Sequence, residues 1–133
     1  MTFYQTLQQS TTSERDYLLS SPLIGAALNG TVSRGTYIAF LEQAYHHVAH
    51  TVPLLMACGS RLPSRLGWLR DAMAHYIAEE NGHEEWILND IRASGGDPES
   101  VRNGEPALAT ELMVSTMSNR DAPKHPVSTL SML

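Results

Sequence analysis

Apolar residues recur at helical spacing through most of the chain, and no stretch alternates apolar and polar positions for long enough to predict a strand. Ser21-Pro22 predicts a helix start, Asn29-Gly30 predicts a helix end, and Pro53 predicts a kink. We therefore predict an irregular all-α bundle. Its helices cover residues 3–19 (broken around 10–13), 22–28, 34–58 and 64–93, and a further helix opens at Glu105-Pro106.

The last third of the chain is predicted to be more broken. Ser94-Gly95-Gly96 ends the long helix, and Asp97 caps a short helical turn after it. Residues 118–126 are polar and rich in proline, which predicts a loop, and the apolar residues 127–133 predict the start of an incomplete helix. We expect a single domain over residues 1–133 with about four or five main helices.

The helix predicted over residues 64–93 carries a carboxylate where an apolar side chain is expected. At about 100° per residue, Glu80 falls at the centre of the stripe that should face the core. That stripe comprises Leu69, Met73, Ile87 and Ile91. An ionised carboxylate in a core is costly unless it is paired, so Glu80 is expected to have a partner.

His83 is the natural partner, because residues three apart on a helix project side by side. Glu80 and His83 could bind one metal ion together, and an oxygen and a nitrogen without a thiolate favour iron or manganese, with zinc as a further option. Gly82 between them predicts a place where another element or a ligand approaches closely. A buried Glu–His or Glu–Arg pair that only fixes packing is the alternative, and the residues leave both open.

The helix predicted over residues 34–58 offers a second polar group. Glu42, His46 and His50 recur every four residues, a spacing that suits metal ligands or a proton relay. Partly buried histidines with ordinary hydrogen bonds are the simpler interpretation. Tyr45 is expected in the core with its hydroxyl satisfied, and Glu111 is a further candidate carboxylate ligand.

Composition narrows the classes of function. The 133 residues carry a net charge of −5 with no cluster of Lys and Arg, which argues against nucleic-acid and anionic-membrane binding. The single cysteine, Cys58, excludes an internal disulfide and a multi-cysteine metal cluster. The chain has no apolar run of membrane-spanning length and no signal peptide, so we expect a cytoplasmic protein.

Three segments resemble the heme-oxygenase-like superfamily. They are residues 37–56 (YIAFLEQAYHHVAHTVPLLM), 79–90 (EENGHEEWILND) and 107–114 (ALATELMV), within a resemblance that covers residues 14–117. The chain is most similar to the iron-containing redox enzymes grouped with TenA and PqqC. The resemblance implies a helical bundle around a central cavity, without heme, in which carboxylates and histidines on three helices hold iron.

Under that resemblance, Glu80 and His83 match the first half of the iron site, with Glu42, His46 and Glu111 as further candidate ligands. Tyr76, Glu84, Tyr45 and His50 are then expected beside the ligands or in the cavity. The remaining family ligands would come after Leu133, so the chain is expected to be a truncated bundle with half a site.

Three functions follow as hypotheses. The first is a non-heme iron-dependent oxidase or oxygenase that acts on a small-molecule or acyl substrate and completes its site in a homodimer. The second is a non-catalytic helical module that dimerises through an exposed apolar face. The third is a cofactor-independent enzyme like TenA or PqqC. For the TenA chemistry, Cys58 does not match the position of the family's cysteine nucleophile.

Overall fold

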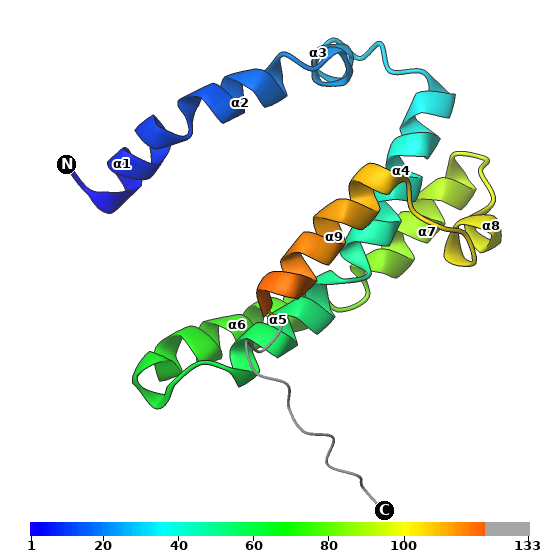
Figure 1. Cartoon of the computed structure of the whole chain (residues 1–133). Coiled ribbons are helices and arrows are strands. Elements are labelled where there is room, and N and C mark those ends of the chain that lie inside the picture. The colour runs from blue at the N-terminus through cyan, green and yellow to red at the C-terminus, as the bar shows by residue number, and fades with distance from the viewer. Residues whose placement is uncertain (122–133) are drawn as a thin grey trace, which may run out of the picture. The chain divides into compact units, whose positions relative to one another are not determined.

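The computed structural model describes residues 1–121, and within that range the chain forms only helices and the turns that join them (Figure 1). The all-α prediction is therefore confirmed. The helices are α1 (Phe3–Ser10), α2 (Thr12–Leu19), α3 (Pro22–Leu28), α4 (Arg34–Val48), α5 (Thr51–Ser60), a 3₁₀ turn (Ser64–Leu66), α6 (Gly67–Glu80), α7 (His83–Ala93), α8 (Pro98–Arg102) and α9 (Leu108–Asp121). None of the described helices combines the length and the apolar character that a membrane crossing requires.

The chain divides into two compact units, residues 1–37 and 38–133. The first unit contains α1, α2 and α3. α1 begins with a reciprocal cap, in which the Thr2 hydroxyl accepts the Gln5 N–H at 3.2 Å and the Gln5 side chain accepts the Thr2 N–H at 2.8 Å. The predicted break falls at Thr11, and α3 begins at Pro22 as predicted. No residue of these three helices is buried.

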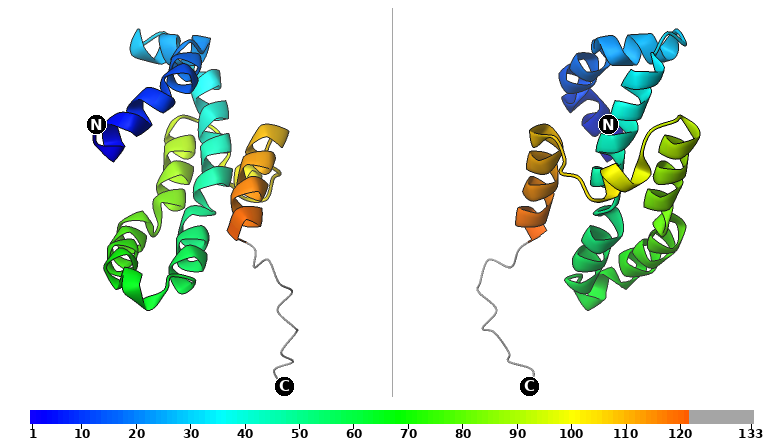
Figure 2. Two further views of the ribbon diagram at one scale, coloured as in Figure 1. Left: turned by 60° about the vertical axis from the view of Figure 1, so that its left-hand side comes forward. Right: turned by 90° about the vertical axis from the view of Figure 1, so that its right-hand side faces the viewer.

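The second unit is arranged around α4 and α5. These helices lie between α9 on one flank and α6 and α7 on the other (Figure 2). Packing contacts join α5 to α6 and to α9, and join α7 to α8. The unit is thus a small bundle in which α5 is shared by two neighbours.

The helix predicted over residues 34–58 is in fact two helices. α4 ends at Val48 and α5 begins at Thr51, which places Pro53 in the first turn of α5. In that turn its missing N–H needs no acceptor, whereas in an unbroken helix its ring would clash with the carbonyl of Ala49, four residues earlier. The proline therefore causes a break at Ala49-His50 and not the predicted kink at its own position.

The core of the second unit is formed by α4, α7 and α8. Its buried apolar side chains are Leu41, Leu88, Ile91 and Val101, with Tyr45 and Ile87 packed against them. No polar or charged side chain is buried in the part of the chain that the structure describes. The core is therefore purely apolar.

A glycine pair ends α7 and closes this core. Gly95 has a φ of +80°, its N–H donates to the carbonyl of Arg92, and the Gly96 N–H donates to the carbonyl of Ile91, both at 2.9 Å. These two bonds form a Schellman motif, as the predicted helix end requires. Gly96 packs so tightly that an added Cβ would lie 2.8 Å from Ile91 Cγ2 and 3.1 Å from Ile38 Cγ2.

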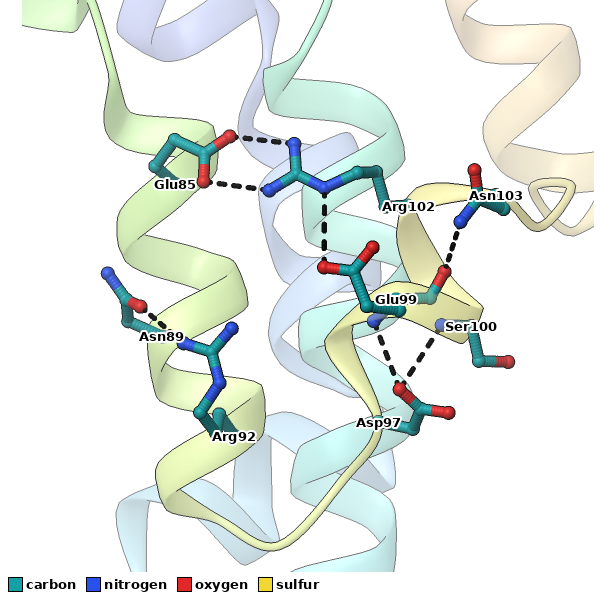
Figure 3. Close-up of polar contacts among 8 residues, drawn as sticks. All are labelled: Glu85, Asn89, Arg92, Asp97, Glu99, Ser100, Arg102 and Asn103. Atoms are coloured by element: carbon teal, nitrogen blue, oxygen red, sulfur yellow. Dashed lines mark hydrogen bonds and ion pairs between the residues drawn. The ribbon is translucent and has the colours of Figure 1, made fainter.

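α8 is held by polar contacts at both ends (Figure 3). Asp97 Oδ1 accepts the N–H groups of Glu99 and Ser100 at 3.0 and 3.3 Å, which confirms the predicted cap. At the other end, the Arg102 guanidinium donates to both carboxylate oxygens of Glu85 on α7, at 2.8 and 2.9 Å. The bidentate pair ties α8 to α7 and raises the pKa of Arg102 above its ordinary value.

α9 begins at Leu108, two residues after the predicted start at Glu105-Pro106, and its first turn is capped from α4. Gln43 Oε1 accepts the Ala107 N–H at 2.9 Å and the Thr110 hydroxyl at 2.8 Å. The helix continues through Asp121, so the loop predicted over 118–126 is wrong for residues 118–121. Residues 122–126 and the incomplete helix predicted over 127–133 lie outside the described residues.

Replacing Gly96 with alanine should destabilise the protein by about 1–3 kcal/mol, because the new methyl group overpacks the contact with Ile91 and Ile38. Chemical unfolding would measure the change. Gly67→Ala is the matched control, since an added Cβ there meets nothing within 4 Å. Equal stability of the Gly96→Ala and Gly67→Ala variants would contradict the close packing described for the glycine pair.

The Glu85–Arg102 pair should make stability depend on pH. Arg102 holds the pKa of Glu85 below its ordinary value of 4.5, so the ionised carboxylate stabilises the folded state above that pH. This contribution disappears as the pH falls through the lowered pKa. The difference in Tm between the wild type and Glu85→Gln should therefore shrink on acidification from about pH 7 to about pH 3. The pair would not be the source of the pH dependence if this Tm difference stayed constant on acidification. The same conclusion would follow if Glu85→Gln gave the same narrowing of the Tm difference in an Arg102→Met background.

Candidate metal site

Glu80 and His83 face each other across a break between two helices. Glu80 is the last residue of α6 and His83 is the first residue of α7, so the single helix predicted over residues 64–93 is wrong. Glu80 Oε2 and His83 Nδ1 are nonetheless 3.1 Å apart. The side chains are 19% and 29% exposed, which leaves both of them within reach of a small ion.

Gly82 is what allows this break. Its φ is +91°, a left-handed conformation that costs an alanine about 1–2 kcal/mol. The predicted close approach of another element to Gly82 is wrong for the described residues, because an added Cβ would meet nothing within 4 Å. The close approach of a ligand stays a prediction. The left-handed conformation of Gly82 turns the chain between α6 and α7, and after this turn the His83 ring lies beside the Glu80 carboxylate.

Glu80 is half-buried and not in the core. Within α6 it continues a half-buried stripe made by Leu69, Met73 and Ile77. The prediction of a central core position assumed that this stripe continues into α7. Because the helix breaks at Asn81-Gly82, the apolar face of α7 forms the core without Glu80.

Two rings surround the pair. The pKa of Tyr76 is raised by the negative charge of Glu80 and by a hydrogen bond to its carboxylate, because both favour the protonated phenol. On the other side, the Trp86 ring lies against the His83 ring, with centroids 4.4 Å apart. Glu80 therefore has two partners, and the His83 ring is held between a carboxylate and an indole.

The sequence pattern of one family, described as iron-containing redox enzyme, matches residues 38–133. This chain belongs to that family. The match begins at the first residue of the second compact unit, which contains both Glu80 and His83.

A solved structure is similar over nearly the whole chain. It is a domain of unknown function with a heme oxygenase-like fold from Shewanella denitrificans OS217, 27% identical in sequence, with a TM-score of 0.77. The match covers 95% of this chain and 55% of that one, so the chain spans about half the length of the solved protein. No curated protein matches the chain. The predicted family and the predicted heme-oxygenase-like fold are both confirmed.

The family's description as iron-containing gives the Glu80–His83 pair a chemical test. Two neighbouring ligands at right angles on an octahedral ion, each at about 2.1 Å, have their donor atoms about 3.0 Å apart. The observed separation of 3.1 Å fits that geometry, and it also fits an ordinary hydrogen bond. The pair therefore suits two adjacent positions on iron. Within residues 1–121, no three His, Cys, Asp or Glu side chains are grouped so as to hold one ion.

The other candidate ligands lie around separate pockets. His46, His50 and Glu111 line a pocket of about 220 Å³ between α4 and α9, and Glu42 and His46 line a neighbouring one of about 210 Å³. Neither Glu80 nor His83 lines either of these two pockets. The structure thus brings Glu42, His46, His50 and Glu111 near one another but not into one site with Glu80 and His83.

The two remaining candidates have different surroundings. Tyr45 packs against the core, and its ring meets the edge of the His46 ring at 5.4 Å between centroids. Glu84 is half-buried in the first turn of α7, next to His83 in sequence.

Three contributions to this region were not foreseen in the sequence. Trp86 follows His83 at the i, i+3 spacing that brings side chains together, so its role could have been predicted. The cap from Gln43 binds the N–H of Ala107, 64 residues later in the chain, and no local sequence pattern predicts it. The apolar pocket that Tyr76 lines depends on how α5, α6 and α9 meet, which is equally non-local.

Proposed function

We propose that Glu80 and His83 are two of the iron ligands of a non-heme oxidase or oxygenase, and that a second copy of the chain completes the site. The observation that carries this proposal is the 3.1 Å separation of Glu80 Oε2 and His83 Nδ1 in a family described as iron-containing. Iron held there would supply the activation of O₂ for abstraction of hydrogen from a small-molecule or acyl substrate.

The surrounding residues have supporting roles. Tyr76 lies one turn before Glu80 on α6, near enough for the Glu80 carboxylate to raise the pKa of its phenol. Trp86 covers one face of the His83 imidazole and limits its rotation. Both neighbours restrict the two side chains and keep an oxygen and a nitrogen side by side, which lowers the entropy cost of binding an ion.

A second copy would supply the missing ligands. One chain offers one carboxylate and one imidazole in the pair, whereas non-heme iron oxygenases commonly use at least two imidazoles and a carboxylate. Two-fold pairing places the same residues of both copies around one axis, so it would bring together two Glu80 and two His83 side chains. Carboxylate and Glu-x-x-His ligands on facing helices are typical of di-iron helical bundles.

The proposal predicts a metal stoichiometry that depends on the pair. Protein loaded anaerobically with Fe²⁺, or with Mn²⁺ as a substitute, should retain at least half an equivalent of metal per chain after desalting. Glu80→Gln and His83→Gln should each lower the metal affinity about 10-fold or more, because each removes one of few ligands. Elemental analysis measures retention, and quenching of Trp86 fluorescence by the ion beside it reports binding directly.

Glu79→Gln is the matched control, because it makes the same chemical change at the preceding, exposed position of α6. It should bind metal like the wild type. If the wild type retains less than about a tenth of an equivalent, or if Glu79→Gln weakens binding as much as Glu80→Gln, the pair is a structural contact and not a metal site.

A second candidate function is a non-catalytic helical module that dimerises through α9. The observation that favours it is the exposure of four large apolar side chains on this short helix. They are Leu108 at 68%, Leu112 at 57%, Met113 at 43% and Met117 at 42%. Apolar side chains gathered on one exposed helix mark association surfaces more often than free surface.

This candidate predicts that Leu112→Glu converts a dimer into a monomer at micromolar concentration, because a carboxylate would be buried unpaired at the interface. Sedimentation equilibrium measures the change. Ser118→Glu introduces the same charge at an exposed position about 120° around α9 from Leu112 and should leave the dimer intact. A monomeric wild type would contradict both this candidate and the dimeric iron site.

A further inference from the structure

An apolar pocket of the second unit lies where α5, α6 and α9 meet. Its volume is about 390 Å³, and its walls include Leu54, Leu55 and Cys58 of α5, Met73 and Tyr76 of α6, and Met117 of α9. A cavity of about 150 Å³ is enough to hold one benzene ring. This pocket therefore has room for a molecule of about two rings.

Among the described residues that line the pocket, none is Asp, Glu, Lys or Arg. His47, near the end of α4, and Thr51, at the start of α5, also line it. A charged ligand would lose its hydration there without gaining an ion pair. The His47 and Thr51 side chains can hydrogen-bond one neutral polar group, such as a hydroxyl. The pocket accordingly selects neutral molecules.

The chemistry of the walls distinguishes an aromatic ring from a saturated one. Three of the lining side chains carry sulfur, those of Cys58, Met73 and Met117, and Tyr76 adds an aromatic ring. The sulfur of Met73 lies at the contact between α5 and α6, where a Cβ on Gly59 would be 4.0 Å from it. Sulfur–ring and ring–ring contacts favour aromatic partners beyond what burial of area alone gives.

We propose that this pocket binds a neutral aromatic molecule of about two fused rings bearing a hydroxyl or carbonyl group. Tyr76 is the link to the candidate metal site, because its side chain lines the pocket and it lies one turn before Glu80 on α6. Binding in the pocket does not require a metal, so this inference stands apart from the proposed iron chemistry.

Equilibrium dialysis with two matched probes tests the proposal. 2-Naphthol and its saturated analogue decahydro-2-naphthol share one carbon skeleton and one hydroxyl, and they differ in aromaticity. The protein should bind 2-naphthol about 3- to 10-fold more tightly than the saturated alcohol, because only the aromatic ring gains the contacts with sulfur and Tyr76. The anionic 2-naphthoate should bind at least about 10-fold more weakly than 2-naphthol.

Variants locate the site. Met73→Leu and Met117→Leu keep the volume of the pocket and remove sulfur, so each should reduce the preference for 2-naphthol over the saturated alcohol. Met113→Leu makes the same change on α9 at a residue that does not line the pocket and should leave the preference unchanged. Leu55→Phe should weaken both probes by filling the pocket, and circular dichroism would check that this variant is folded.

The outcomes separate cleanly. Equal or tighter binding of the saturated alcohol overturns the aromatic assignment, and so does an unchanged preference in Met73→Leu and Met117→Leu. Absence of binding of either alcohol by the wild type overturns the pocket as a ligand site. Glu80→Gln should still bind 2-naphthol, so a failure of the metal experiment would leave this result unaffected.

Discussion

The contact of Gly96 with Ile91 and Ile38 is the constraint on which the second unit depends. With no side chain at position 96, the turn after α7 lies directly on Ile91 and beside α4. This approach closes the apolar core of Leu41, Leu88, Ile91 and Val101. It also brings the C-terminal end of α7 against α4, and His83 lies at the opposite end of α7.

Helix ends set by local chemistry could be predicted from the sequence, whereas apolar periodicity alone conceals the breaks that interrupt it. The cap of α8 is local, because Asp97 Oδ1 accepts the N–H groups of residues two and three positions later. Such a cap can be predicted from the sequence. The breaks at Ala49-His50 and Asn81-Gly82 interrupt apolar patterns that continue on both sides. Periodicity cannot reveal such breaks, since each half satisfies the pattern by itself.

The candidate site shows the same division. The spacing of Glu80 and His83 is local, and their side chains do meet, although across a helix break that the spacing alone conceals. The burial of Glu80 was overestimated because one continuous helix places it among residues of α7 that pack elsewhere. The packing of α4 and α9 decides whether Glu42, His46 and Glu111 share one site with Glu80 and His83. The structure places these three residues around other pockets. The spacing of Glu42 and His46 within α4 could not reveal that separation, because it depends on contacts between helices.

The hydrogen bonds from Gln43 to the start of α9 have a consequence for the order of folding. The first turn of α9 takes its side-chain cap from a residue 64 positions earlier, so this cap exists only after α4 has formed and the two helices have met. Closing such a long loop is slow compared with forming α4, whose bonds are all local. α4 should therefore serve as a template, and α9 should gain its first stable turn late, when the chain returns to it.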